Sequence, residues 1–425
     1  MKGIVIYHRS LMLIAVIVFC VFLLTRCING EQEDDKNVIK NSKYGLFAGS
    51  ANCAACHKNI YESHIQTAHF HTSEIAIQNA IKGSFDSGKN SFHYSTGGLV
   101  RMEKRNGGLY QVAYVNGTER VSQRFDIITG SGTKGQTFLT WTGNNLFQLP
   151  VTYFTSKSQW CNSPGNPNKI ALNRPITSRC LECHTTFVEK ISAENIEPEA
   201  FDKNQMILGV DCEKCHGPGL EHVKFHQQNP AETKAKFIIN PASFSRLQSL
   251  DLCALCHGGR LQKTKPSFEF MTGDKLSDFF LLNTAPRDVA SIDVHGNQYG
   301  LLTASKCFIN SEKMTCITCH NIHENEKGAT GVFSQRCISC HTDKHSNIPL
   351  CKMTVISNAE KSRNCTSCHM PEIPSKAIAV LLQGEDTLTP ASMHTHLIKV
   401  YPEETKKVLA FIKNQHLSAT KQKGN

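Results

Sequence analysis

One short motif, Cys-x-x-Cys-His, occurs seven times in this sequence of 425 residues. At this spacing two thiols can add to the two vinyl groups of one haem, and the histidine that follows can bind its iron. Shuffling a chain with 19 cysteines and 20 histidines would yield about 0.04 copies. A zinc site would need paired Cys-x-x-Cys units without a fixed following His, and a thioredoxin-like protein would need one motif in a strand–helix unit. The motif therefore predicts seven covalently attached c-type haems, each with one iron.

The predicted attachment residues form two sets. The haem-linking cysteines are Cys53, Cys56, Cys180, Cys183, Cys212, Cys215, Cys253, Cys256, Cys316, Cys319, Cys337, Cys340, Cys365 and Cys368. The proximal iron ligands are His57, His184, His216, His257, His320, His341 and His369. Since every motif supplies a histidine to its iron, no catalytic residue is predicted.

Each iron has a sixth position, and a second histidine is the expected distal ligand. Of the 20 histidines, seven belong to the motifs and one, His8, to the N-terminal leader, which leaves 12. The predicted distal ligands are His69, His222, His295, His323 and His396, followed by His93 and His345. His64, His71, His226, His394 and His416 are interpreted as supporting or surface residues, with exchange open between His64 and His71 on one helix and between His222 and His226 on another. Met271, Met314 and Met353 are the competing ligands.

The first 26 residues predict export from the cytoplasm. Leu11 to Leu24 is an unbroken apolar run of 14 residues, which is shorter than the about 20 that span a membrane and fits the core of a secretory signal. Cys27 stands where bacterial lipoproteins are cleaved and lipidated, although Arg26 departs from the small residue usual there. A lipid on Cys27, an uncleaved N-terminal helix and a plain cleaved signal stay open. Each places the rest of the chain in the periplasm or at the outer membrane or cell surface of a bacterium.

The charge and composition agree with a haem-rich chain. A formal net charge of +10 can indicate a nucleic-acid partner. However, seven haems would bring roughly 14 propionate carboxylates, and the surplus Lys and Arg are interpreted as their partners, so no nucleic acid is expected. Hydrophobic residues make up only 40% of the chain. Porphyrin faces would replace much of the core, and without haem the chain is not expected to fold compactly.

The predicted fold is a mainly α and irregular multihaem cytochrome c fold organised around the seven haems, with a small β-rich insert between the first two motifs. The segments are a leader or anchor (1–26), a polar tether (27–50), a first haem segment (51–90), the insert (91–175), a six-haem domain (176–400) and a C-terminal helix with a tail (401–425).

Local patterns place elements within these segments. Asn116-Gly117 is a strong two-residue hairpin signal inside the insert. A helix is expected over 58–82, a rigid loop over 160–167, and a helix from about Pro402 to Lys413. Cys161, Cys307 and Cys351 lie outside the motifs and the leader; one disulfide and one free thiol can form among them, without an assigned pair.

Several blocks resemble a known family. Cys53 to His69 resembles the opening of cytochrome c-552/4-type proteins, in which a His near the position of His69 is a distal ligand and a Trp often stands where His64 is here. The blocks from Cys212 to His222 and from Cys368 to Pro371 are also similar to this family. The group is related to the class that contains the tetrahaem carrier of nitrifying bacteria, hydroxylamine oxidoreductase and pentahaem nitrite reductase.

The resemblance covers the first haem segment and most of 176–400, and leaves the insert unexplained. The pentahaem nitrite reductases carry Lys in place of the proximal His at their active haem. All seven motifs here end in His, so the resemblance does not imply that active site.

Three functions fit the sequence. The first is an electron carrier whose bis-His haems connect redox protein partners, or a quinol-linked membrane donor, with an external acceptor. The second is an oxidoreductase that acts on a small nitrogen or sulfur compound at one haem with an open distal site. The third is a docking module in which the insert binds a partner. The carrier is favoured over a stand-alone enzyme, because a proximal His is present at every site.

Overall fold

The fold is described from a computed structural model of the chain. The structure describes residues 39–41, 45–281, 288–341, 351, 353, 356, 357, 360 and 362–422. The predicted leader, most of the tether, the predicted ligand His345 and the side chain of His416 lie outside this part. Within the described ranges, no helix is both long and apolar enough to cross a membrane.

The helical elements are short apart from two. They are α2 (Ser50–Ala54), α3 (Lys58–His64), η2 (Phe70–Thr72), η3 (Thr155–Lys157), α4 (Ser178–His184), α5 (Cys212–His216), α6 (Leu220–Gln228), η4 (Pro241–Ser243), α7 (Arg246–His257), η5 (Leu276–Asp278), η6 (Val289–Ser291), α8 (Gln298–Thr303), α9 (Lys306–Ile309), η7 (Cys316–Thr318), α10 (Thr330–Ile338), α12 (Cys365–His369) and α13 (Pro402–Gln422).

In the described part of the chain there are six sheets, built from the following strands. They are β1 (Lys40–Asn41), β2 (Gly45–Leu46), β3 (Ser73–Ile75), β4 (Ser91–His93), β5 (Gly98–Arg105), β6 (Gly108–Val115), β7 (Thr118–Arg124), β8 (Ile127–Thr129), β9 (Gly135–Thr142), β10 (Asn145–Gln148), β11 (Val151–Phe154), β12 (Gln159–Asn162), β13 (Arg174–Pro175), β14 (Thr185–Lys190), β15 (Phe201–Leu208), β16 (Gln262–Lys263), β17 (Phe280–Leu281), β18 (Glu372–Leu381) and β19 (Leu388–His394).

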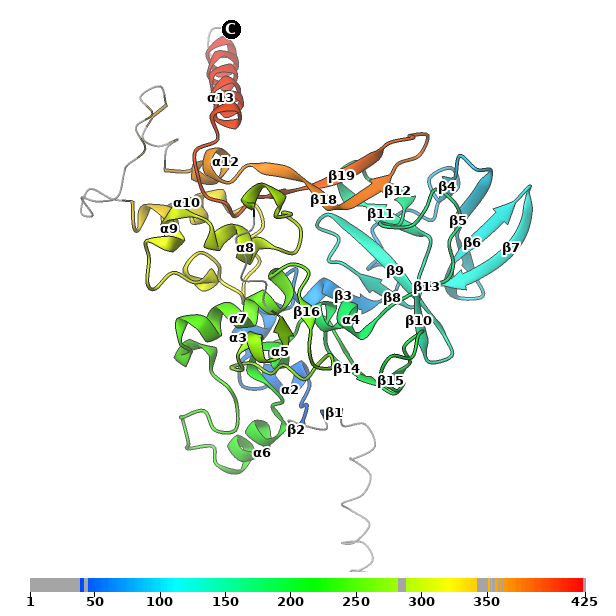
Figure 1. The fold of residues 1–425 in the computed structure, drawn as a ribbon, viewed down its shortest axis with the longest axis horizontal. Coiled ribbons are helices and arrows are strands. Elements are labelled where there is room, and N and C mark those ends of the chain that lie inside the picture. Colours follow the sequence, from blue (N-terminus) through cyan, green and yellow to red (C-terminus); the bar gives the residue numbers. More distant parts are fainter. Residues whose placement is uncertain are drawn as a thin grey trace, which may run out of the picture.

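The molecule has a β half and a helical half, which lie side by side in Figure 1. In the β half, β4, β5, β6 and β7 make a four-stranded antiparallel sheet in chain order. A seven-stranded sheet follows the path β12-β11-β9-β10-β13, with β8 also on β9 and β3 on β8. The hairpin of β18 and β19 reaches from the helical half across to β12, so the C-terminal part of the chain joins the two halves.

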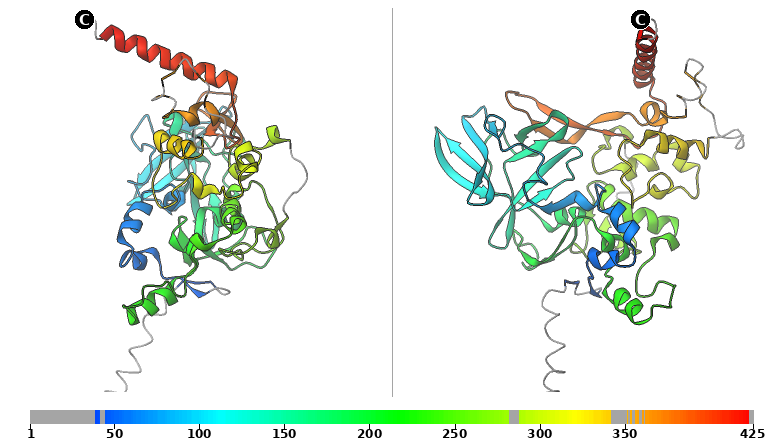
Figure 2. Two further views of the ribbon diagram at one scale, coloured as in Figure 1. Left: turned by 90° about the vertical axis from the view of Figure 1, so that its left-hand side faces the viewer. Right: turned by 180° about the vertical axis from the view of Figure 1, so that it is seen from behind.

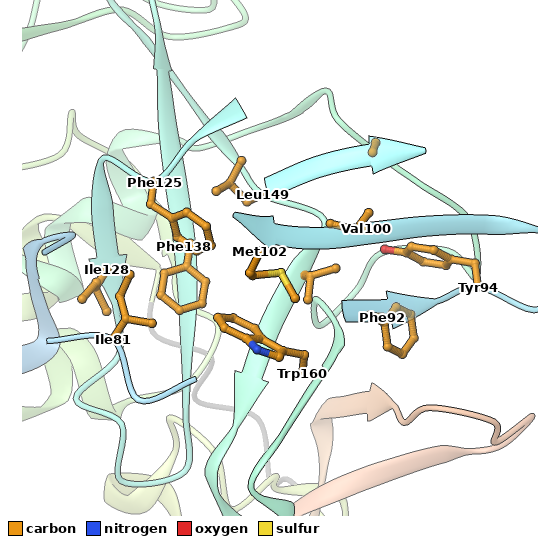
Figure 3. Packing of buried hydrophobic residues seen from close by; sticks show 12 residues of the cluster. Ile81, Phe92, Tyr94, Val100, Met102, Phe125, Ile128, Phe138, Leu149 and Trp160 are labelled. Carbon is orange, nitrogen blue, oxygen red and sulfur yellow. The ribbon is translucent and has the colours of Figure 1, made fainter. Parts of the chain in front are cut away.

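A large apolar core fills the space between the two sheets of the β half. Figure 3 shows Phe92, Met102, Phe125, Phe138 and Trp160 packed together. Alternation places one face of β5 in this core, and the Trp160 indole N–H donates to the carbonyl of Ser84 at 2.9 Å. This core consists of side chains alone, because the sheets bring their own apolar faces together.

The turn between β6 and β7 confirms the Asn116-Gly117 hairpin signal. Asn116 has φ 50° and Gly117 has φ 74°, and the flanking Val115 and Thr118 are paired. Two positive φ angles in succession define the type I′ turn, whose twist matches that of the strands. The C-terminal helix is also present as α13, which extends beyond Lys413 and projects from the body in both views of Figure 2.

The helical half contains all the Cys-x-x-Cys-His motifs, on short helices joined by loops. Among them, α2 and α12 bury no side chain, and α3 buries only His64. The local cluster around α7 contains Ala254, Leu255, Phe270 and Phe280. Little side-chain core therefore supports the motifs on α2 and α12, whereas α4 and α7 bury apolar side chains of their own.

Three expectations differ from the structure. Helices make up 29% and strands 27% of the chain, so sheet is as prominent as helix and the mainly α description is too narrow. The helix expected over 58–82 ends at His64; the chain turns through η2 and enters β3, because Ser73 to Ile75 pair with β8. The loop expected over 160–167 begins as strand β12, since Trp160 and Cys161 pair with β11.

A disulfide among the three remaining cysteines, which the sequence left open, is absent from the structure. Cys161, Cys307 and Cys351 are all described, and each is a free thiol. Cys161 is fully buried, with its thiol 3.5 Å from the carbonyl of Thr152. The apolar cluster around it, which includes Val380 from β18, explains why a small apolar-like thiol is accommodated there.

Candidate haem-binding sites

We number the seven motifs 1 to 7 in chain order and call each, with its proximal histidine, a site. In site 1 the backbone N–H of His57 donates to the carbonyl of Cys53 at 2.8 Å, and the same i to i+4 bond is present from His320 to Cys316 at 3.0 Å. One helical turn therefore presents the first cysteine, the second cysteine and the histidine on one face. This is the arrangement that one porphyrin with its iron requires.

Four proximal imidazoles face a second imidazole from a distant part of the chain. The distances between ring centres are 6.5 Å for His57 and His222, 6.2 Å for His69 and His257, 6.2 Å for His216 and His323, and 6.1 Å for His320 and His396. Two metal–nitrogen bonds of about 2 Å, with about 1 Å from each nitrogen to its ring centre, give a separation of about 6 Å. The spacing thus fits an iron between the two rings.

Hydrogen bonds orient several of these rings for metal binding. The Nδ1 atoms of His216, His222 and His369 lie 2.9, 2.8 and 3.0 Å from the backbone carbonyls of Ile239, Lys236 and Lys399 respectively. An imidazole that donates through Nδ1–H leaves the lone pair of Nε2 for a metal. The residues present therefore fit bis-His haem at sites 1 and 3, and His369 of site 7 has the same Nδ1 arrangement.

Burial also keeps two of the distal candidates neutral. Burial lowers the pKa of His69 to about 4, and it lowers the pKa of His396 to about 4. A neutral imidazole can bind iron, whereas a protonated one has no free lone pair. Both rings are thus in the protonation state that iron binding requires near neutral pH.

The other predicted distal residues lie in different surroundings. His295 is a neighbour of His184: burial lowers the pKa of His184, and His295 adds to the effect. His93 is exposed on β4, where its backbone N–H donates to the Gln383 side chain at 2.9 Å. Ring contacts between His93 and another histidine are absent within the described residues. His345, the candidate nearest to His341 in sequence, lies outside them.

The structure describes the side chains of four of the five histidines interpreted as supporting or surface residues. Both ring nitrogens of His71 are engaged, Nδ1 with Glu74 and Nε2 with the carbonyl of Ile65. His64 is buried, with its ring centre 6.3 Å from that of His323. The ring of His226 lies 4.6 Å from that of His222, and His394 Nδ1 lies 2.6 Å from the carbonyl of Met370. His64 and His71 do not share a helical face, because α3 ends at His64.

The motifs lie beside one another in a defined order. Among the helical elements that carry a motif, α2 contacts α5, α4 contacts α7, α7 contacts η7, and α10 contacts α12. These contacts join sites 1 and 3, sites 2 and 4, sites 4 and 5, and sites 6 and 7. Short distances between attachment sites mean that the groups they hold are neighbours, which electron exchange between them requires.

Contacts between cysteine side chains connect the same pairs of sites. Their side chains are free thiols here and stand for the thioether sulfurs of the haem-loaded protein. The hydrogen-bonded thiol pairs are Cys53 with Cys212, Cys183 with Cys256, Cys253 with Cys316, and Cys337 with Cys365.

Further hydrogen bonds connect the remaining sites. Lys214 of site 3 donates to the carbonyl of Thr186, two residues after His184 of site 2, at 3.5 Å. Thr272 donates to the carbonyl of Lys214 at 3.0 Å, and the next residue, Gly273, accepts from Gln248 of α7 at 3.0 Å, which joins site 3 to the helix of site 4. Arg336 donates to the carbonyl of Cys319 at 2.7 Å, which joins the helix of site 6 to site 5.

Two acidic residues inside the motifs are functional features that sequence reasoning missed. Glu213, in site 3, is buried and accepts the backbone N–H groups of Ala48, Gly49 and Gly219 at 2.8, 2.9 and 2.7 Å. Burial raises the pKa of Glu213 although these donors favour its charged form. The carboxylate fastens the segment before α2 to α5, so it sets the position of site 1 against site 3. A charged residue between the cysteines of a motif was the available signal.

Replacing Glu213 with alanine should lower the free energy of unfolding by about 3 kcal/mol, because three partly or fully buried N–H donors lose their acceptor. Denaturant unfolding of the holoprotein measures this. The control is Glu221→Ala, which removes an exposed carboxylate from α6 and should change the unfolding free energy by less than about 0.5 kcal/mol. Equal effects of the two changes would contradict the anchoring role of Glu213.

The second acidic residue, Glu182 in site 2, belongs to a buried charge cluster. Glu182 is 1% exposed. It pairs with Arg179 Nη1 at 2.9 Å and with Lys263 Nζ at 2.8 Å, and it accepts the backbone N–H of Phe268 at 2.9 Å. Arg179 Nη1 also lies 3.1 Å from Cys183 Sγ. The cluster thus places fixed charges directly beside the Cys183 thiol.

Comparisons with known proteins show that this chain is similar to multihaem cytochromes. A family model described as cytochrome c554 and c-prime matches residues 154–217, which contain sites 2 and 3. The C-type polyheme cytochrome OmcC of Geobacter sulfurreducens is 23% identical over 216 residues, which covers 45% of this chain and 25% of OmcC. The match thus spans about a quarter of the length of this curated relative.

A solved structure shares the fold. The crystal structure of the outer cell wall cytochrome OcwA aligns with a TM-score of 0.51 over 85% of this chain and 81% of that chain, at 16% sequence identity. The fold is therefore similar although few residues are shared. The family model, the curated relative and the solved structure together support a multihaem c-type cytochrome.

Proposed function

We propose that this protein is a seven-haem c-type cytochrome that transfers electrons between redox partners outside the cytoplasm. The observation that carries the proposal is the separation of 6.1–6.5 Å between four proximal imidazoles and their facing imidazoles. Haem iron with two histidines is six-coordinate, and its chemistry is one-electron transfer. The chain's own contribution is to hold each iron from both sides and to place the sites next to one another.

The axial pairs we propose are His57 with His222 at site 1, His184 with His295 at site 2, His216 with His323 at site 3, His257 with His69 at site 4, and His320 with His396 at site 5. The predicted His345 and His93 remain the candidates for His341 and His369. In all five pairs the distal residue comes from a stretch that follows another motif. Each such site is therefore completed only when distant segments fold together.

The proposed location rests on the sequence before Ile39 and on the relatives. The apolar run from Leu11 to Leu24 supports export, and Cys27 would carry a lipid if it is processed as in lipoproteins. The structural relative OcwA is an outer cell wall cytochrome, which supports a place at the cell envelope for this chain. We propose redox proteins, or a quinol-linked membrane donor, as the partners there.

Two measurements on the purified holoprotein test the proposal. Intact mass should exceed that of the processed polypeptide by seven haems, because all seven motifs are complete. Electron paramagnetic resonance of the oxidised protein should show only low-spin iron, since each iron would have two histidine ligands. Fewer haems would contradict the count. A high-spin haem that binds nitrite or hydroxylamine would instead favour an oxidoreductase.

A further inference from the structure

We propose that Ser305 is a positioning residue for two haems at once: it sets the distal ligand of site 5 and, through one backbone segment, the proximal ligand of site 7. The segment comprises residues 395–399, which follow β19, and we call it the ligand segment. This inference rests on the proposed function, because it concerns iron ligands. It goes further in giving a role to a residue that lies outside every motif.

Ser305 lies at the start of a helix, but its side chain does not cap that helix. It is the residue before α9, with φ −81° and ψ 139°, and its hydroxyl makes no hydrogen bond to the first N–H groups of α9, all of which are described. A serine at this position usually accepts such a bond. Ser305 is 1% exposed, so neither capping nor contact with water explains its hydroxyl.

The Ser305 hydroxyl instead holds the backbone that carries His396. It donates to the carbonyl of His396 at 2.9 Å, and the same oxygen accepts the N–H of Ile398 at 2.8 Å. The carbonyl of Leu301 lies 3.2 Å from this oxygen as a second acceptor. One buried hydroxyl thus bonds the ligand segment twice, once as donor and once as acceptor, which fixes the direction in which the segment runs.

His396 depends on this support because its own ring has little. Its Nδ1 is buried and has no hydrogen-bond partner of good geometry among the described residues, whereas His216 and His222 each have a backbone carbonyl at Nδ1. The ring centre of His396 nevertheless lies 6.1 Å from that of His320, at an interplanar angle of 28°. The position of this ring relative to His320 is therefore set through its backbone.

The other end of the ligand segment orients the proximal ligand of site 7. Lys399 directly follows Ile398, and its carbonyl lies 3.0 Å from Nδ1 of His369. The N–H of Lys399 donates back to the carbonyl of His369 at 3.3 Å. A carbonyl that accepts from Nδ1–H fixes the ring and makes the imidazole a more basic ligand, which favours ferric iron.

Hydrogen bonds within the ligand segment join its two ends. The N–H of Leu397 donates to Thr395 Oγ1 at 3.1 Å, and the hydroxyl of Tyr401 donates to the carbonyl of Leu397 at 2.8 Å. Thr395 is buried. The two ends therefore have little room to move independently, so a change at Ser305 should reach both iron ligands.

Ser305→Ala in the holoprotein tests this by electron paramagnetic resonance and potentiometric titration. Loss of both bonds should leave His396 less firmly bound. A fraction of one haem should then become high-spin, and that haem should bind added carbon monoxide at least about tenfold more tightly. A second haem should stay low-spin and shift its midpoint potential upward, because His369 becomes the less basic ligand. Ser305→Thr, which keeps the hydroxyl, should restore both signals.

Reference variants identify the two haems that respond. His396→Ala should make the first of them fully high-spin, and Cys365→Ala/Cys368→Ala should remove the second. The matched control is Ser163→Ala, which removes an equally buried hydroxyl that donates to the carbonyl of Leu149 at 2.7 Å within the β half. It should lower stability and leave every spin state and midpoint potential unchanged.

Unchanged spin states and midpoints in Ser305→Ala with seven haems bound would overturn the proposal, and so would a response confined to site 5 or equal changes in Ser163→Ala. If Ser305→Ala does not accumulate, Ser305→Cys decides, since a thiol has a similar size but forms weak hydrogen bonds. It should show the same two changes to a smaller extent, and their absence would count against the role of Ser305. A wild-type protein with fewer than seven low-spin haems would instead contradict the proposed function itself.

Discussion

Replacing His69 with alanine should convert one haem from low-spin to high-spin iron and leave the others unchanged. The ring centre of His69 lies 6.2 Å from that of His257, and the two residues are far apart in sequence. The imidazole of His69 faces that of His257 across the position an iron would take, so its removal leaves one axial position that small molecules can enter. The oxidised variant should show a new high-spin resonance, and the reduced variant should bind one equivalent of carbon monoxide.

His71 provides a matched control on the same segment. Its Nδ1 lies 3.2 Å from a carboxylate oxygen of Glu74, and its Nε2 lies 2.9 Å from the carbonyl of Ile65. Since protein groups already engage both nitrogens, His71→Ala should leave all spectra low-spin. A high-spin signal from His71→Ala, or none from His69→Ala, would show that the two histidines have been assigned the wrong way round.

The motifs were readable from sequence because their chemistry is local. The two cysteines and the proximal His of a site lie within five consecutive residues, and one turn of helix brings them onto one face. The distal residue has no such constraint. His57 faces His222, and His320 faces His396, so only tertiary structure decides these pairs. Sequence reasoning could rank histidines by their setting but could not match each to an iron.

The charged residues inside the motifs show a second limit. Glu182 and Glu213 look alike in sequence, since each stands between the cysteines of a motif. The structure gives them different partners: cations and one backbone N–H for Glu182, and three backbone N–H groups for Glu213. A buried carboxylate must be paired or hydrogen-bonded, but which of the two occurs depends on segments far away in the chain.

Sheet content was underestimated for a related reason. The hairpin at Asn116-Gly117 carries its own turn signal and was predicted. The hairpin of β18 and β19 lies in a segment assigned to the haem domain, and its buried residues Val380 and Ala391 pack against Phe154 and Cys161 of the β half. Side-chain core is absent from α2 and α12 but extensive between the sheets, so the two halves of the molecule are expected to depend on porphyrin to different degrees.

The sheets and the motif segments should differ strongly in their dependence on haem. In protein expressed without haem maturation, the two sheets of the β half should stay folded while the motif segments unfold. Phe92, Val100, Met102 and Phe138 are fully buried by other side chains, whereas α2 and α12 bury none. Burial of apolar area of this kind stabilises a fold without a cofactor. Hydrogen exchange with peptide resolution should show slow exchange in β5 and β9 and fast exchange over 50–64 and 362–370.

The Trp160→Ala substitution should weaken the core of the β half and leave the haem sites unchanged. The indole is almost fully buried and hydrogen-bonded to Ser84, so its removal should cost about 3–5 kcal/mol. In haem-free protein this loss should abolish the slow exchange in β5 and β9. In the holoprotein the haem spectra should be retained, because Trp160 packs within the sheets and not against a motif. Fast exchange throughout the haem-free wild-type chain would instead mean that the sheets, like the motif helices, depend on haem for their stability.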